Sequence, residues 1–176
     1  MHVADLVNGG KTDINITLDK NIDLTGKGWT PIGTSFDNSY KGTFDGGGHT
    51  ITGLAVTTND QFVGLFGYLN RAGTVKNVVM EGIQITSNHG SSQAGGVVGF
   101  SRGTIENCSV SGSVSGTVYV GGVVGLMGRF HHRMQFLGHS EGNGRCRRRG
   151  RSDEFECHHD RLLCHGQRDL RNSPHK

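Results

Sequence analysis

Apolar residues alternate with small or polar residues in short runs through residues 1–128, and glycines separate one run from the next. After Asn107, for example, the apolar residues Cys108, Val110 and Val114 have serines between them. A period of two predicts a short strand with one buried face. Residues 1–128 carry no apolar stripe of helical period and useful length, so we expect strands rather than helices.

The runs belong to repeats. The segments FVGLFG (62–67), AGGVVG (94–99) and VGGVVG (120–125) share a hydrophobic G-x-x-G core, and the last two begin 120 − 94 = 26 residues apart. The segments 73–82 and 103–112 align position by position: Val75 with Ile105, Asn77 with Asn107, Val78 with Cys108, Met80 with Val110, and Gly82 with Gly112. Repeats at an interval of about two dozen residues are typical of a solenoid.

Short strands between glycine turns favour a parallel β-solenoid, in which each coil covers the hydrophobic face of the coil before it. We expect the glycines at the corners of the coils, where the chain needs a positive φ angle or a close approach of two backbones. The sequence therefore predicts an all-β fold for residues 1–128, which we call the repeat region.

The N-terminal part of the repeat region is less regular. Residues 12–26 alternate well enough for strands, with Ile14, Ile16 and Leu18 on one side. Residues 28–54 surround a turn-forming Asp-Gly-Gly-Gly and supply five large apolar side chains: Trp29, Phe36, Phe44, Ile51 and Leu54. We expect the rings of this segment to close this end of the core.

The order of motifs resembles a known family. W-x-P-I-G (29–33) is followed by G-x-F-D-G-x-G-H-T-I-x-G-L (42–54), then G-L-F-G (64–67), G-x-V-x-N-V (73–78) and the G-G-V-V-G repeats. This series is similar to the GLUG-motif β-helix regions of large bacterial surface and secreted proteins. Such regions occur in adhesin-like proteins and upstream of the catalytic part of IgA-specific metallopeptidases.

The resemblance implies a right-handed parallel β-helix outside the cytoplasm, at the cell surface or secreted. It implies a non-catalytic stalk or binding surface, with host or matrix glycans or proteins, or neighbouring repeats of a longer protein, as partners. It implies no reaction and no cofactor.

Composition divides the chain near Gly128. The repeat region carries seven Lys/Arg against nine Asp/Glu, whereas residues 129–176, which we call the tail, hold the other eleven basic and six acidic groups. The tail also holds seven of the ten histidines and three of the four cysteines. The net charge of +3 therefore comes from the tail.

We interpret the tail, from about Arg129, as a frameshifted translation of further β-helix coils. Reading one base out of step turns Met134 and the first base of Gln135 into a cysteine codon, at 108 + 26 = 134. The arginines 147–149 can become Gly-Gly-Val, at 121 + 26 = 147. With few apolar residues at any period, the tail is predicted to be disordered.

The tail contains ligand types that zinc prefers: Cys146, Cys157, His158, His159, Cys164 and His165. Their spacing lacks paired C-x-x-C or H-x-x-x-H motifs, so we predict adventitious metal binding rather than a selected site. The arginines at 147–149 and 151 have no aromatic residues between them, so we expect no selected recognition of nucleic acid.

An alternative function is a carbohydrate-active β-helix enzyme of the polysaccharide lyase or glycoside hydrolase type. Such chemistry needs converging carboxylates or a carboxylate with a basic partner. The candidates are Asp37, Asp45 and His49. A structural role is the stronger reading, because Asp45 starts a glycine turn in which its side chain can bond local amides. Cys108 is expected to be an inward-facing free thiol.

The segment MHVADLVNGG (1–10) has neither a basic region nor an apolar region of a secretion signal. No run of 18 apolar residues occurs, so we expect no membrane span. If the resemblance holds, the chain is an internal fragment of a longer protein. We then expect exposed strand edges and self-association at the end of the repeats, around 120–125.

Overall fold

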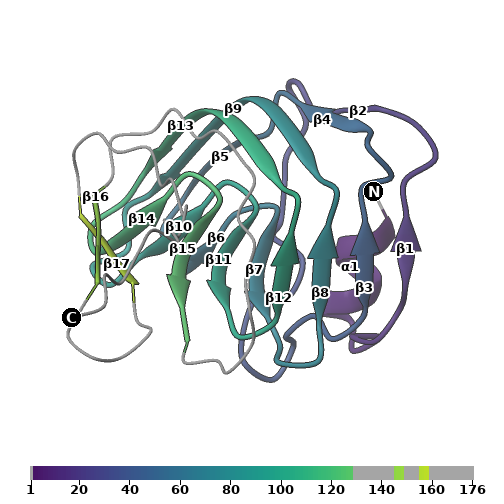
Figure 1. Ribbon diagram of the computed structural model, residues 1–176, viewed down its shortest axis with the longest axis horizontal. Helices are drawn as coiled ribbons and strands as arrows, with labels where there is room; N and C mark the ends of the chain where they lie inside the picture. Colours follow the sequence, from purple (N-terminus) through teal and green to yellow (C-terminus); the bar gives the residue numbers. More distant parts are fainter. Residues whose placement is uncertain (1, 129–144, 149–154, 159–176) are drawn as a thin grey trace, which may run out of the picture.

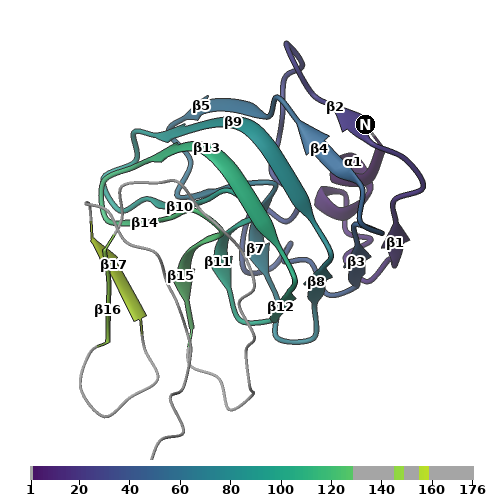
Figure 2. The ribbon, with the colours of Figure 1, turned by 45° about the horizontal axis from the view of Figure 1, so that its top comes forward.

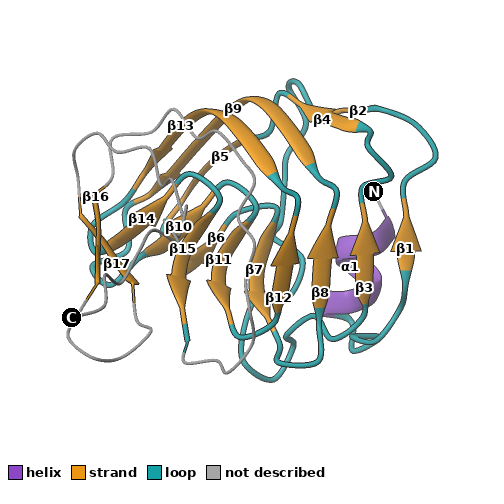
Figure 3. Cartoon of the chain, in the orientation of Figure 1, coloured by secondary structure: helices purple, strands orange, loops and turns teal. Residues whose placement is uncertain are grey.

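The computed structural model describes residues 2–128 of the 176-residue chain and, within the tail, residues 145–148 and 155–158. Its elements are α1 (His2–Asn8), β1 (Ile16–Thr17), β2 (Ile22–Asp23), β3 (Thr43–Asp45), β4 (Thr50–Thr52), β5 (Ala55–Thr58), β6 (Phe62–Val63), β7 (Phe66–Leu69), β8 (Thr74–Lys76), β9 (Val79–Ser87), β10 (Gln93–Gly95), β11 (Val98–Ser101), β12 (Thr104–Glu106), β13 (Ser109–Ser115), β14 (Tyr119–Gly121), β15 (Val124–Met127), β16 (Arg145–Arg148) and β17 (Phe155–His158). Strands dominate the described residues (Figure 3).

The strands of the repeat region form four parallel sheets. Sheet A has the order β1-β3-β8-β12, and sheet B has the order β2-β4-β9-β13 with β5 also paired to β9. Sheet C has the order β7-β11-β15, and sheet D has the order β6-β10-β14. One coil of the chain visits sheets D, C, A and B in turn, and the next coil repeats this path beside it (Figures 1 and 2). The fold is a parallel β-solenoid of about four turns, which confirms the predicted class.

The predicted alignment of the repeats is confirmed over most of its length. Ile105 pairs with Val75 in sheet A, and Val110 pairs with Met80 in sheet B. The alignment of Gly82 with Gly112 is wrong, because Gly112 pairs with the next residue, Ile83, after a register shift. An extra residue in one strand of a pair produces such a β-bulge.

Coil length is less uniform than the repeat suggests. Ala94 pairs with Val120, at the expected interval of 120 − 94 = 26 residues. Ala94 also pairs with Val63 in the preceding coil, and that interval is 94 − 63 = 31 residues. The longer coil has nine residues in β9 where the next has seven in β13. Surface loops and strand ends absorb added residues at small entropic cost, so the stack tolerates the difference.

The core runs along the axis of the stack between the four sheets. The largest fully buried side chains are Tyr40, Phe44, Phe66, Ile32, Ile51, Leu54, Leu65, Leu69, Met80, Ile83, Ile85 and Ile105. Removing these apolar side chains from water is the main stabilising term of such a fold. Phe44 forms an edge contact with Phe66 at 5.2 Å between ring centroids, which joins two successive coils.

The N-terminal end of the core is covered partly as predicted. Phe44 is fully buried, and Trp29 packs against the core while its ring N–H donates to the carbonyl of Gly64. The expectation for Phe36 is wrong, because its side chain is 59% exposed on the outside of the coils. A short helix performs this covering role instead.

Helix α1 lies at the N-terminal end of the stack, beside β1 and β3 (Figure 1). Ala4 and Val7 of this helix are buried, and both belong to the hydrophobic core. Asn8 at its end accepts a hydrogen bond from the backbone N–H of Gly33 and donates one to the carbonyl of Pro31. The helix has seven residues, and none of the described helices is long and apolar enough to cross a membrane.

Gly96 and Gly122 lie at the corner between sheets D and C, as predicted, and Gly99 and Gly125 lie beside it in β11 and β15, where two backbones approach closely. A methyl group added at Gly99 would lie 2.6 Å from both the carbonyl oxygen of Gln93 and the amide nitrogen of Val63. One added at Gly125 would lie 2.7 Å from the amide nitrogen of Ala94. No real side chain tolerates such distances to backbone atoms, so these G-x-x-G positions require glycine.

The structure describes two short strands of the tail. β16 and β17 pair in antiparallel orientation, with Cys146 opposite Cys157 in the register. The remaining residues of the tail, on which the prediction of disorder mainly falls, lie outside the described residues. The division of the chain near Gly128 stays a prediction.

Candidate functional site

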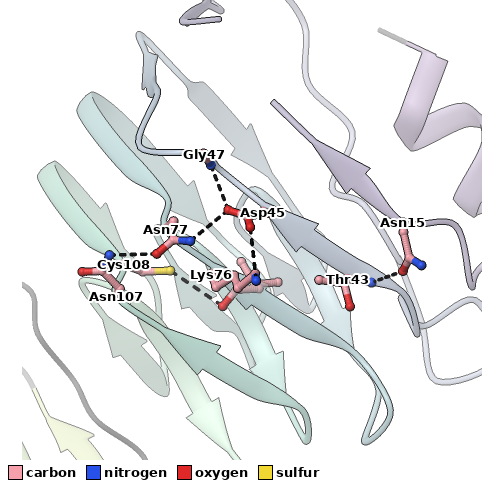
Figure 4. A network of polar contacts seen from close by, with 9 residues as sticks. Asn15, Thr43, Asp45, Gly47, Lys76, Asn77, Asn107 and Cys108 are labelled. Carbon is pink, nitrogen blue, oxygen red and sulfur yellow. Dashed lines mark hydrogen bonds and ion pairs between the residues drawn. The ribbon is translucent and has the colours of Figure 1, made fainter. Parts of the chain in front are cut away.

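Asp45, one of the three candidate catalytic residues, ends β3 and takes part in a network of polar contacts (Figure 4). Its Oδ1 atom accepts hydrogen bonds from the side-chain amide of Asn77 and the backbone N–H of Gly47, both at 2.9 Å. Its Oδ2 atom lies 3.2 Å from the ammonium group of Lys76. The Asn77 hydrogen bond, followed by that of Gly47, lowers the pKa of Asp45 to about 2.

The network continues into the next coil. The side-chain amide of Asn107 donates to Oδ1 of Asn77 at 2.8 Å (Figure 4). Both asparagines have a positive φ angle, 54° for Asn77 and 47° for Asn107, and asparagine is among the few residues that adopt this conformation readily. Asp45, Asn77 and Asn107 thus hold the same corner in three successive coils. We call these three residues the polar ladder.

The other two candidate catalytic residues are not bonded to Asp45. The backbone N–H of His49 donates to the carbonyl of Gly46 and so closes the glycine turn. Asp37 is exposed in the loop between Ile32 and Tyr40, before β3 begins. Among the described residues, no hydrogen bond or ion pair joins Asp37 or His49 to the carboxylate of Asp45. The catalytic alternative stays a prediction.

Cys108 is a buried free thiol, as predicted. Its side chain is 5% exposed, and its sulfur lies 3.2 Å from the carbonyl oxygen of Glu106 and 3.9 Å from that of Val75. Burial raises the pKa of this thiol to about 11. Cys108 is therefore a protonated core residue at neutral pH and a poor nucleophile.

The candidate metal ligands fall on the tail. Cys146, Cys157 and His158 lie in β16 and β17, while His159, Cys164 and His165 lie outside the described residues. In the part of the chain that the structure describes, no group of three or more His, Cys, Asp or Glu side chains is placed to hold a metal ion. The prediction of adventitious metal binding by the tail is therefore untested.

A cluster of aromatic rings gathers outside the core, over the corner of sheets C and D. Tyr68 of β7 is 4.7 Å from Phe100 of β11 and 5.4 Å from Phe62 of β6, measured between ring centroids. Phe36, from the coil before, meets Tyr68 edge to face at 5.9 Å. These four side chains come from three coils, and we call them the aromatic surface. Phe36 is its exposed member.

Arg102 lies against the aromatic surface. Its guanidinium carbon is 5.7 Å from the centroid of the Phe36 ring and 5.8 Å from that of Phe100, within range of a cation–π interaction. Burial raises the pKa of Tyr68, and the nearby charge of Arg102 opposes that rise. Arg102 is exposed, and no carboxylate of the described residues forms an ion pair with it.

Gln93 lies in β10 beside the aromatic surface. In sheet D it pairs with Phe62 on one side and Tyr119 on the other, so the three share one face of the sheet. The residue is 8% exposed, and its side-chain oxygen is buried without a hydrogen-bond partner. Among the described residues, this is the buried side-chain oxygen or nitrogen without a hydrogen-bond partner. Such atoms are rare, because buried polar atoms nearly always form a hydrogen bond.

Sequence reasoning missed the aromatic surface, although a signal was present. Tyr68, Phe100 and Leu126 each follow the last glycine of a G-x-x-G segment, and the structure pairs them in register. Large apolar residues at one position of successive repeats form a continuous row on a solenoid. The aromatic surface could have been found by comparing residues at the same position of each repeat, rather than residues that are close along the chain.

Comparisons with known proteins agree with the fold. The GLUG motif is matched by residues 90–115, which run from before β10 into β13. The chain is 41% identical over 101 residues to halomucin of Haloquadratum walsbyi and 35% identical over 97 residues to a candidate Gly-rich membrane protein of Evansella cellulosilytica. These matches cover 57% and 54% of this chain but 1% and 11% of the two relatives.

Among solved structures, the chain is similar to a candidate immunoglobulin A1 protease of Bacteroides ovatus. The TM-score is 0.61 with 23% sequence identity, over 74% of this chain and 41% of that protein. A likeness at this identity shows the fold alone. The resemblance to GLUG-motif β-helix regions is thus confirmed both by the matched motif and by the fold.

Proposed function

We propose that this chain is a non-catalytic, adhesive module of a cell-surface or secreted protein, in which the stacked coils serve as a stalk that also presents a binding surface. The observation that carries the proposal is the division of the molecule into a hydrogen-bonded stack and an outer cluster with unsatisfied groups. A stack of coils in register is stiff and is lengthened by adding coils. These properties suit a spacer.

The similarity to surface proteins supports the location. One relative is named a halomucin and the other a Gly-rich membrane protein, and the chain matches a short part of each. We infer that a module that forms a short part of much longer proteins acts through its surface and its length. The proposed partners are host or matrix glycans or proteins, or neighbouring coils of the same polypeptide.

The state of Asp45 supports a non-catalytic role. With a pKa of about 2, this carboxylate is ionised at neutral pH and cannot act as a general acid. Its two oxygens are also taken up by Asn77, Gly47 and Lys76. Fold likeness to an enzyme adds no chemistry, because unrelated functions share one fold.

A single assay tests adhesion and catalysis together. Beads coated with the full chain are exposed to a panel of immobilised glycans and matrix proteins, and both bead retention and release of soluble fragments are measured. We expect retention without release. Release of sugar fragments that is abolished by Asp45→Asn or Asp37→Asn would instead support the carbohydrate-active enzyme. Absence of retention on every surface would contradict adhesion.

A further inference from the structure

The aromatic surface and Arg102 combine two chemical features at one place. There is an exposed aromatic ring and a guanidinium group that lies over two rings. Binding sites for small ligands are typically lined by aromatic side chains with a few placed polar groups. The combination therefore restricts the chemistry of a ligand.

The ring of Phe36 provides an apolar platform. Its side chain is 59% exposed, and its edge contact with Tyr68 fixes the orientation of the ring. The face of an aromatic ring carries a partial negative charge, whereas C–H groups on one side of a pyranose ring carry a partial positive charge. A sugar ring is therefore a well-matched partner for this platform.

Arg102 provides a charge that is already oriented. Contacts with Phe36 and Phe100 hold the guanidinium group, and no described carboxylate neutralises it. A guanidinium group binds a carboxylate through two parallel hydrogen bonds, and a fixed side chain loses little entropy in doing so. The site therefore favours a sugar that carries a carboxylate over a neutral sugar.

The two exposed groups of the site are the ring of Phe36 and the guanidinium group of Arg102. Gln93 takes no direct part, because its side-chain oxygen is buried out of reach of a ligand. An apolar C–H face and a carboxylate occur together in a uronic acid.

We propose that Phe36 and Arg102 form a binding site for a saccharide that contains uronic acid, with the carboxylate on Arg102 and the sugar ring on Phe36. This site deepens the proposed adhesive function and rests on it. It uses none of the residues of the polar ladder.

The test is calorimetric titration of the full chain with a tetrasaccharide that contains glucuronic acid. A glucose tetrasaccharide and a sulfated neutral tetrasaccharide are titrated in parallel. We expect the glucuronate compound to bind at least about tenfold more tightly than the neutral one, since a charge-assisted pair adds that much. The sulfated compound should rank between them, because a sulfate offers charge without the planar fork of a carboxylate.

Variants locate the site. Arg102→Gln and Arg102→Lys should each weaken binding of the glucuronate compound by about tenfold, because lysine lacks the planar fork. Phe36→Ala should weaken it by a similar factor, about tenfold, through loss of the platform.

Two matched variants serve as controls. Lys41→Gln removes one positive charge from another exposed position, and Leu6→Ala removes a second exposed apolar side chain. Both should change affinity by less than about twofold, since distant surface charges are screened by salt. Circular dichroism of every variant should match the wild type, so that lost binding reports the site rather than the fold.

Equal binding of glucuronate and neutral compounds, or unchanged affinity in Arg102→Gln, would overturn the proposal. No binding of any tetrasaccharide would overturn it as well. The bead assay separates this failure from failure of the adhesive function. Beads that are retained on protein or neutral glycan surfaces, with or without Arg102, would leave adhesion standing and remove the uronate site.

Discussion

The polar ladder and the aromatic surface each join side chains from three successive coils, but they differ in how far the polar groups are satisfied within the protein. In the ladder, Asn107 donates to Asn77 and Asn77 donates to Asp45, so each side chain satisfies its neighbour. On the aromatic surface, the rings contact one another while the adjacent Arg102 lacks a described acidic partner.

The difference separates stability from recognition. Polar groups that already form hydrogen bonds or ion pairs within the protein gain little free energy from a ligand. Polar groups that are oriented but lack such partners gain the most when a ligand binds. The ladder should therefore affect the free energy of unfolding and leave binding unchanged. The exposed residues of the aromatic surface should affect binding and leave the free energy of unfolding nearly unchanged.

The largest expected effect on stability is at Gly99 in β11, beside the corner between sheets D and C. Gly99→Ala places a methyl group against the backbones of Gln93 and Val63, so the two sheets must shift. Overpacking of this kind should lower the free energy of unfolding by about 3 kcal/mol in urea denaturation. Gly90→Ala is the matched control, because a methyl group there meets nothing within 4 Å and the φ angle is not positive. Equal stability of the two variants would refute the close-approach explanation.

A smaller loss is expected in the ladder. Asn77→Ala removes both ladder hydrogen bonds and places a β-carbon in the left-handed region, at an expected cost of about 2 kcal/mol in the same assay. Asn77→Gly relaxes the backbone but still lacks the amide. If Asn77→Gly were as stable as the wild type, the hydrogen bonds would contribute nothing and the ladder would be only a conformational requirement.

The ladder also predicts a dependence on pH. The pKa of Asp45 is about 2 in the folded protein, below the 3.8 of an unperturbed aspartate, so its contribution to stability is complete above pH 3.8 and is lost as the pH falls towards 2. Asp23, whose pKa is lowered by hydrogen bonds with Thr25, acts in the same direction. The comparison must therefore use Asp45→Asn. Between pH 5 and pH 2.5, the midpoint of urea unfolding should fall further for the wild type than for this variant.

The smallest expected effect is that of Phe36→Ala on the fold. Because the ring is mostly outside, its loss should change the free energy of unfolding by less than about 1 kcal/mol. The affinity for the glucuronate compound should nevertheless fall. If Phe36→Ala lowered the melting temperature as much as Asn77→Ala does, Phe36 would contribute to the stability of the fold. The two regions would then not differ in their effect on stability.

Much of the fold could be predicted from the sequence, because successive coils of a solenoid carry the same pattern of apolar and polar residues. The partners of Val75 and Met80 follow from two segments that alternate in the same way. The bulge before Gly112 could not be predicted, since it shifts the register by one residue within matching sequence. Helix α1 was missed because its buried residues span less than two turns, too few for a helical period to emerge.

The candidate site was less predictable. The alignment of Asn77 with Asn107 was visible in the sequence. The bond from Asn77 to Asp45 was not, because Asp45 pairs in the sheet with Lys76, one residue before Asn77. Phe36 was assigned to the core by its hydrophobicity, although a large aromatic residue also serves at a surface that binds a partner. Burial follows from position within the coil, which composition does not specify.

The interpretation of the tail as a frameshifted translation stays a prediction. Sequencing of the encoding DNA across codons 126–136 should show one base fewer than this reading requires. The shifted frame would then continue into another Gly-Gly-Val-Val-Gly coil. An unchanged frame would contradict the interpretation and make the cysteines and histidines of the tail targets for direct metal titration.

The separation of stability from recognition is tested most directly by the shift that the glucuronate tetrasaccharide causes in the midpoint of urea unfolding. A ligand that binds only the folded state raises this midpoint. The wild type and Asn77→Ala should show the same gain in unfolding free energy, because distant sites act independently, while Arg102→Gln should show almost none. A gain that disappears in Asn77→Ala, or persists in Arg102→Gln, would contradict the account.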